Sequence, residues 1–317
     1  MNREQWDALN ELIFGRWRST GYLTEHAKGN KGINPKTGKP WVIAVVDNAK
    51  VTHMNNCYSP LPILLPEADI RRYSTDVGAY YGIVRELKEC IVDGVDFITL
   101  SMSGEVDRSD LRKVIQECDD AGIKVFTSAG NEGDEAKRWP ACYETTFSCG
   151  SVDNDLLPSQ WASHGEDLTF VQFGQNTPVD NGTEGEEWVL KSGDSFTTNI
   201  IMATGVLAAS YLDDQSPLRV KEALIEKCID LSLVCKDNKT GYGFPTMDME
   251  EFFTVKSMIF DYYGKDLSWR VMEIKSAMIE NNMTTEEAEA FVNPNYHIVG
   301  YEDLEGIKIP IYGGRKW

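Results

Sequence analysis

The chain has 317 residues, of which 42% are hydrophobic and 10% aromatic, so it can fold around one large core with a smaller appendage. Its formal net charge of −19 disfavours nucleic acid and anionic membrane surfaces as partners, because both need a basic footprint. No signal-like apolar segment follows Met1, and no apolar run is long enough to span a bilayer. We therefore expect a cytoplasmic protein that binds neither nucleic acid nor membrane.

The cysteines indicate a reducing compartment rather than a disulfide framework or a zinc site. They number seven, are widely scattered and show no CxxC spacing: Cys57, Cys90, Cys118, Cys142, Cys149, Cys228 and Cys235. The acidic stretches 153–155 and 180–187 do not follow a calcium-loop spacing, which favours solvated loops. We expect no cofactor and no metal.

The first part of the chain predicts a helix, a loop and a buried strand. Residues 2–18 have an amphipathic helical pattern, and 29–40 form a Gly/Lys/Asn-rich loop. The continuous apolar run 41–46 is typical of a strand that is buried on both faces, and it ends at Asp47. In open α/β sheets, the carboxyl ends of the strands are where functional sites form.

An alternation of helices and strands follows. The prolines between 57 and 69 predict a connecting segment without regular secondary structure. The next elements expected are a helix over 76–91, a strand over 95–101, a helix over 109–121 and a strand over 123–128. Such an alternation predicts right-handed crossovers and a doubly wound, mostly parallel α/β sheet.

The remainder predicts shorter strands in 140–190, an apolar helix after Ser195, and helices over 216–229 and 247–253. The pattern changes at 255, where helices are expected over 266–281 and 284–292. We therefore divide the chain into an N-terminal helix and loop (1–37), an α/β domain (38–254) and a small, mainly helical C-terminal appendage (255–317). The appendage is expected to dock on the core or on a partner.

The segment Gly193-Asp194-Ser195 has two interpretations. A glycine permits a tight turn, and Ser195 would then lie in the first turn of a helix, where free N–H groups support attack on a carbonyl. Alternatively, Asp194 or Ser195 only caps a buried helix.

Three segments at strand ends resemble those of the subtilisin-like serine protease family. Asp47 matches its triad aspartate, Asn131 its oxyanion-hole asparagine and Ser195 its nucleophile, while Ser101-Met102-Ser103-Gly104 resembles its substrate-binding strand. The resemblance covers about 38–254 and implies a subtilisin-like fold and a protein or peptide as partner.

The departures from this family concern the catalytic base. The family carries its histidine on a helix between the aspartate and the substrate strand, and that helix is expected to be missing here. His53 lies in this interval but resembles the non-catalytic histidine just beyond the aspartate, while His26, His164 and His297 lie elsewhere. Asp194 replaces the usual threonine and would set a negative charge beside the oxyanion.

Three functional hypotheses follow. The first is an inactive protease that acts in binding or assembly, because a serine without a general base is a poor nucleophile. The second is an active serine endopeptidase with Ser195, Asp47 and Asn131 in family roles and a displaced base such as His53. The third is a structural component of a larger assembly that docks through 255–317.

Overall fold

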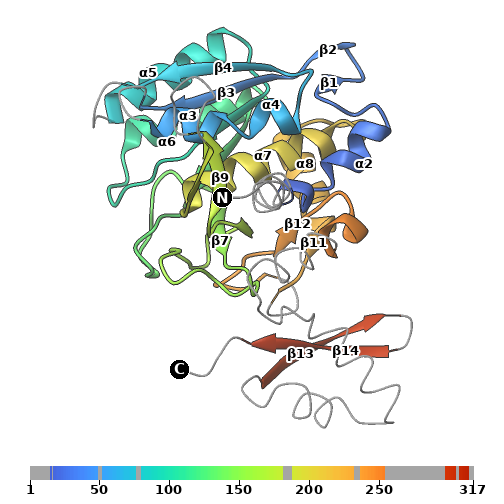
Figure 1. Cartoon of the computed structure of the whole chain (residues 1–317). Coiled ribbons are helices and arrows are strands. Elements are labelled where there is room, and N and C mark those ends of the chain that lie inside the picture. Colours follow the sequence, from blue (N-terminus) through green and yellow to red (C-terminus); the bar gives the residue numbers. More distant parts are fainter. Residues whose placement is uncertain are drawn as a thin grey trace.

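A six-stranded parallel sheet forms the centre of the molecule (Figure 1). The computed structural model describes residues 15, 17–48, 52–75, 80–180, 188–231, 236–253, 297–304 and 307–313. The strands lie in the order β4-β3-β5-β6-β7-β8, with the bounds Val42–Asp47 (β3), Asp69–Ser74 (β4), Phe97–Leu100 (β5), Lys124–Ser128 (β6), Thr146–Val152 (β7) and Phe170–Phe173 (β8).

Both faces of the sheet are buried, which explains why its strands are apolar without interruption. Along β3, Ile43 and Val45 enter one hydrophobic core, while Ala44 and Val46 enter another on the opposite face. Successive side chains of a strand point to opposite faces, so a strand covered on both sides has no polar position to alternate with.

Helices form the two outer layers. One face is covered by α5 (Tyr80–Val92) and α6 (Ser109–Asp120), whose apolar sides share a core with the sheet. The other face is covered by α2 (Tyr22–Ala27), α3 (His53–Tyr58), α4 (Leu61–Leu64), α7 (Asp194–Ala209) and α8 (Pro217–Glu226). The central helix α7 is buried along its whole length, as its apolar sequence predicts.

Four antiparallel pairs complete the described structure. They are β1 (Ile33–Asn34) with β2 (Lys39–Pro40), β9 (Thr177–Asp180) with β10 (Trp188–Lys191), β11 (Cys228–Ile229) with β12 (Phe244–Pro245), and β13 (His297–Leu304) with β14 (Ile307–Gly313). The described part of the C-terminal appendage is therefore a β-hairpin. The two helices expected in that appendage, over 266–281 and 284–292, lie outside the described residues.

The doubly wound parallel sheet is confirmed, but two local predictions are wrong. The interval between Asp47 and the substrate strand does contain helices: α3 begins at His53, and α4 lies in the stretch 57–69 that was expected to be irregular. The helix predicted over 216–229 is confirmed as α8, but it ends at Glu226, and Cys228 and Ile229 pair with β12 instead.

Other expectations have no structural test. The helix 2–18 falls almost wholly outside the described residues, and the domain boundaries and the docking role of 255–317 stay predictions. No helix in the described part of the chain is long and apolar enough to cross a membrane.

The contact between sheet and α7 generates a stability prediction. Phe126 is fully buried, its ring lies 4.3 Å from that of Phe147, and a Cβ at Gly205 of α7 would come within 2.9 Å of it. We expect Phe126→Ala to lower the free energy of unfolding by about 3–5 kcal/mol, because it leaves a cavity in this layer. Val92→Ala, at a position that is 80% exposed, should change it by less than about 0.5 kcal/mol in the same denaturant titration. Equal effects would contradict the packing described.

Candidate active site

Asp47 is the last residue of strand β3, and each oxygen of its carboxylate accepts a hydrogen bond. Its Oδ1 accepts a hydrogen bond from the Asn48 N–H at 2.6 Å, and its Oδ2 accepts one from Nδ1 of His53, also at 2.6 Å. The Asp47 side chain is buried, whereas the His53 side chain is 33% exposed, so the pair is shielded from water on its carboxylate side. Asp47 therefore fixes the orientation of one imidazole ring at the carboxyl end of the sheet.

His53 is the first residue of α3, between the aspartate strand and β4. The expected absence of a histidine-bearing helix in this interval is therefore wrong; the connection from Asp47 is short, but the helix is present. Because a carboxylate can only accept, Nδ1 carries the proton of this bond and Nε2 is left as the second ring nitrogen. The pair has the geometry of an orienting acid and a potential base.

The surroundings of His53 favour its charged form. Burial by itself lowers the pKa of the imidazole, but the hydrogen bond to Asp47, the contact with Cys57 and the charge of Asp47 outweigh it and raise the pKa to about 10. A proton is therefore held on this ring at neutral pH more firmly than in a free histidine.

Ser195 lies in the first turn of α7, at the edge of the same site. The preceding Gly193 has φ 151° and ψ 156°, a conformation that glycine adopts far more readily than other residues. The Ser195 hydroxyl donates a hydrogen bond to the Ser101 carbonyl at 3.3 Å. The backbone carbonyl of Ser195 accepts hydrogen bonds from Ser101 Oγ at 2.8 Å and from Asn199 Nδ2 at 2.7 Å. These bonds hold the start of α7 against the end of β5.

Two supporting residues were missed in the sequence. Cys57, one turn after His53 on α3, has its sulfur 3.7 Å from Nδ1 of His53 and 3.8 Å from the Ser195 carbonyl oxygen. Asn199, one turn after Ser195, accepts a hydrogen bond from the Thr99 hydroxyl of β5 at 2.8 Å. The i, i+4 spacing of each pair was the available signal, since it puts both residues on one helix face.

Cys57 itself is not arranged as a nucleophile. Burial raises the pKa of its thiol above the ordinary value, and the side chain is fully covered. A protonated, enclosed thiol reacts slowly, because the thiolate is the reactive form. Its role is to fill the space between the imidazole and the backbone of Ser195.

Asn131 and Asp194 meet at the start of α7. The Asn131 Oδ1 accepts from the Asp194 N–H at 2.9 Å, which leaves Nδ2 as the donor of that side chain. Burial raises the pKa of the Asp194 carboxyl well above its usual range, and the neighbouring Ser151 hydroxyl lowers it only in part. Burial thus favours the neutral form of Asp194, which has no negative charge to oppose an oxyanion.

A cavity of about 380 Å³ opens beside Ser195. Ser101, Met102 and Ser103 line one side of it, and Gly104 is joined by backbone hydrogen bonds of 3.0 and 2.8 Å to Trp139, which lines it as well. The other residues that line it are Asn48, Thr75, Ile83, Ser128, Gly130, Asn131, Glu132, Pro140 and Ser195. The cavity brings together Ser195, Asn131 and the predicted substrate strand.

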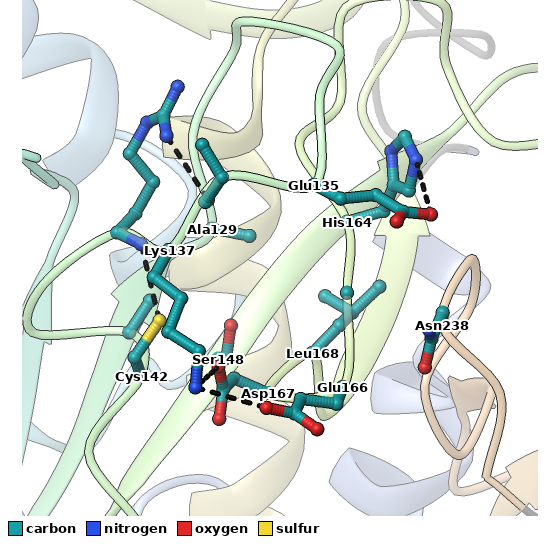
Figure 2. Close-up of a pocket in the computed structure, with 14 residues that line it drawn as sticks. Ala129, Glu135, Lys137, Cys142, Ser148, His164, Glu166, Asp167, Leu168 and Asn238 are labelled. Carbon is teal, nitrogen blue, oxygen red and sulfur yellow. Dashed lines mark hydrogen bonds and ion pairs between the residues drawn. The ribbon is translucent and has the colours of Figure 1, made fainter.

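A second cavity, of about 190 Å³, lies between the segments 129–142 and 164–168 (Figure 2). Lys137 reaches across it to Glu166 at 3.0 Å and Asp167 at 3.6 Å, and Glu135 pairs with His164 at 3.5 Å. Because these charges pair with one another and Ser195 is not among the lining residues, we take the first cavity as the candidate site.

The other histidines are engaged elsewhere. His26 Nε2 contacts the Leu64 carbonyl at 2.9 Å, His164 belongs to the second cavity, and the side chain of His297 lies outside the described residues. Of the described side chains, Asp47, His53 and Cys57 have ligand atoms close enough for a metal ion, all within 4.8 Å. An ion there would have to break the 2.6 Å bond between the first two.

The proposed acidic loops are only partly described. Asp153 Oδ1 accepts from the N–H groups of Asp155 and Leu157 at 2.9 and 3.0 Å, so this carboxylate organises its own turn. Residues 181–187 lie outside the described residues.

Comparison with known proteins gives two kinds of relative. No family model matches the chain. An intracellular serine protease of Paenibacillus polymyxa is 27% identical over 196 residues, or 58% of this chain and 57% of the relative. The major intracellular serine protease of Bacillus subtilis is 23% identical over 177 residues, which cover 53% of this chain and 54% of the relative. Subtilisin E of the same species is 24% identical over 155 residues, which cover 48% of this chain and 40% of the relative. The chain thus spans about half the length of these relatives.

Two solved structures share the fold. A lanthipeptide protease superposes with a TM-score of 0.64 at 16% identity, over 78% of this chain and 95% of its own. The prenylagaramide maturation protease PagA superposes with a TM-score of 0.58 at 16% identity, over 75% of this chain and 98% of its own.

The fold and the site together define the class: a doubly wound α/β protein with an aspartate–histidine pair and a helix-borne serine at the carboxyl edge of its sheet. The sequence relatives make this more specific. The chain is similar in sequence to the subtilisins and intracellular serine proteases and has a subtilisin-like fold, as the resemblance predicted.

The pKa of His53 generates a stability prediction. A folded-state pKa of about 10, above the ordinary 6.5, means that protonated His53 stabilises the fold fully below pH 6.5 and that this contribution is lost as the pH rises through 10. The difference in free energy of unfolding between the wild type and His53→Gln should therefore be largest at acidic pH and shrink towards alkaline pH. Chemical denaturation across this range measures it. A difference that grows with pH would contradict the raised pKa.

Proposed function

We propose that the chain is a serine endopeptidase of the subtilisin type that hydrolyses peptide bonds. Ser195 is the nucleophile, His53 the general base and acid, and Asp47 the orienting carboxylate. Asn131 donates from Nδ2 to the oxyanion, together with the backbone N–H of Ser195. The observation that carries this proposal is the 2.6 Å bond between Asp47 Oδ2 and His53 Nδ1, on a helix that packs beside Ser195.

The reaction follows from these positions. In molecules whose His53 is neutral, the Ser195 hydroxyl leaves the Ser101 carbonyl, gives its proton to the free Nε2 of His53 and attacks the peptide carbonyl. The oxygen of the resulting tetrahedral intermediate becomes negative and accepts hydrogen bonds from Asn131 and the Ser195 N–H. His53 then returns the proton to the leaving amine, and a water molecule repeats the sequence on the acyl-enzyme to release the acid.

Further observations support the proposal. Asp194 is buried, which raises the pKa of its carboxyl and so favours the neutral form that does not oppose an oxyanion. Cys57 packs between the imidazole and the backbone carbonyl of Ser195, and burial raises the pKa of its thiol, so it does not compete as a nucleophile. The relatives are named serine proteases, and two are named intracellular, which also favours a cytoplasmic location.

The competing proposal is an inactive scaffold that acts in binding or assembly. Two observations favour it: the Ser195 hydroxyl donates to the Ser101 carbonyl, and a His53 pKa of about 10 leaves little free base at neutral pH. The active protease explains more, because a retained Asp47–His53 pair at 2.6 Å has no evident use in a scaffold.

The two proposals differ in the reactivity of Ser195. The full chain should be labelled stoichiometrically by a fluorophosphonate probe, and the rate should rise with pH as His53 loses its proton. Ser195→Ala should abolish labelling, and His53→Ala should slow peptide hydrolysis by at least about 10⁴-fold, the scale of triad losses in serine proteases.

His164→Ala is the matched control, since it removes another partly buried histidine that lies in the second cavity. Its labelling rate should equal that of the wild type. Labelling that persists unchanged in His53→Ala, or that never occurs at alkaline pH, would favour the scaffold.

The oxyanion role of Asn131 has its own test. Asn131→Asp keeps the oxygen that accepts from the Asp194 N–H but replaces the Nδ2 donor with a negative oxygen. We expect kcat to fall by about 10²–10³-fold or more, a loss of the size found for this donor in a subtilisin, with KM changing much less. An unchanged melting temperature would show that the start of α7 is intact. A fall in kcat below about threefold would contradict the assigned role.

A further inference from the structure

The loop that carries Asn131 leaves the sheet at the end of β6 and is held by a second segment of the chain. The Ser163 N–H donates to the Gly130 carbonyl at 2.9 Å, and the Gly133 N–H donates to the Trp161 carbonyl at 2.8 Å. One of these backbone hydrogen bonds precedes Asn131 in the chain and the other follows it. The loop is therefore tied down on both sides of the proposed oxyanion donor, although it belongs to no strand.

Glu132, the residue after Asn131, adds two contacts between this loop and Ser163. Its backbone N–H donates to Ser163 Oγ at 3.2 Å, and the Ser163 hydroxyl donates to Oε2 of Glu132 at 3.1 Å. Ser163 is only 2% exposed, so water has little access to its hydroxyl. A Cβ at Gly130 would lie 2.6 Å from Oε2 of Glu132, which shows how closely this carboxylate is folded against the loop.

Arg138 binds the carboxylates of the loop from its other side. Its side chain is only 3% exposed, and each of its nitrogens donates a hydrogen bond: Nε to Glu132 Oε2 at 3.1 Å, Nη1 to the Ala136 carbonyl at 3.1 Å, and Nη2 to both carboxylate oxygens of Asp134 at 3.1 and 3.2 Å. A third carboxylate, that of Glu105, lies 4.0 Å from Nη2. Without this buried cation the three carboxylates would repel one another and the loop would lose its closed shape.

Arg138 does not line the cavity beside Ser195, whereas Asn131 and Trp139 do. Its guanidinium is already engaged by groups of its own loop, so it has no contact of its own to offer a peptide in that cavity. Arg138 can therefore influence the reaction only through the residues that it holds in place.

The orientation of the Asn131 side chain depends on its backbone. Its Oδ1 is fixed by the Asp194 N–H at 2.9 Å, but a single hydrogen bond lets the amide pivot if the backbone shifts. A donor must lie within about 2.7–3.1 Å of the oxyanion, and a displacement of about 1 Å can cost a factor of about 10² in rate. The contacts around Asn131 thus set the precision of its Nδ2.

We propose that Arg138 and Ser163 are positioning residues for the oxyanion donor: through Glu132 they fix the loop around Asn131, so that its Nδ2 stays directed at the oxygen of the tetrahedral intermediate. The inference rests on the proposed function, which assigns that donor role to Asn131. It adds two residues to the active site that do not touch the substrate.

NMR of the full chain with isotope-labelled asparagine tests the positioning without any need for catalysis. The side-chain amide signals of Asn131 are identified by their loss in Asn131→Asp. We expect these signals to lie away from those of free asparagine in the wild type, and to move to the free position in Arg138→Gln and in Ser163→Ala. The signals of Asn199, inside α7, should stay in place in both variants.

Arg219→Gln is the matched control. It removes an arginine that pairs with Glu222 on α8, and neither residue lines the cavity beside Ser195. The Asn131 signals and the rate of peptide hydrolysis should equal those of the wild type.

A double-mutant cycle separates positioning from a general effect on the fold. Arg138→Gln should lower kcat about ten- to a hundredfold with KM changing less than about threefold, because a displaced donor loses part of its contribution to the rate. In Asn131→Asp, which has no donor to misplace, the same substitution should lower kcat by less than about twofold.

Two results would overturn the inference: Asn131 signals that stay in place when Arg138 or Ser163 is replaced, or losses in kcat that multiply with that of Asn131→Asp. Ser163→Ala decides the question by itself if Arg138→Gln does not fold. A wild type that never reacts with a fluorophosphonate contradicts the protease instead, while the NMR signals still report whether Arg138 and Ser163 hold Asn131.

Discussion

The hydrogen bond between Asp47 and His53 is the interaction on which the site depends. It connects the end of the strand β3 to the first residue of α3 at 2.6 Å, and α3 in turn packs through Cys57 against the start of α7. The imidazole is therefore fixed between the sheet and the helix that carries Ser195. Without this bond the partly exposed histidine would have no defined tautomer, and the base proposed for Ser195 would be lost.

The buried start of α7 is the second constraint. The Ser195 carbonyl accepts from Ser101 and Asn199, and the Asp194 N–H donates to Asn131, so the turn is held from both sides. Burying the Asp194 carboxyl costs free energy, and its raised pKa shows that burial favours the neutral form, which costs less to bury than the charged one. The same rigidity gives the cavity its shape, since Ser101 and Asn131 line it together with Ser195.

The strands of the sheet and the polar residues at their ends could be predicted from the sequence, for physical reasons. Strands buried on both faces have continuous apolar runs, so β3, β5 and β6 and the polar residues at their ends could be located. The six-residue helix α3 could not be predicted, because it is too short for a periodic hydrophobic pattern and lacks the histidine motif expected from the family. From the sequence His53 was therefore only a possible displaced base: a six-residue helix and a short loop bring it to Asp47, and no local signal encodes that contact. The partners of Glu132 and Arg138, from separate segments, were equally hidden.

The most direct measurement is a crystal structure of the full chain with a peptidyl phosphonate bound to Ser195. The account predicts the phosphorus covalently attached to Ser195 Oγ, with Nε2 of His53 within hydrogen-bond reach of that oxygen, about 2.6–3.2 Å, and its Nδ1 still on Asp47. A phosphonate that does not attach, or an attached one whose oxygen has no ring nitrogen within reach, would contradict it.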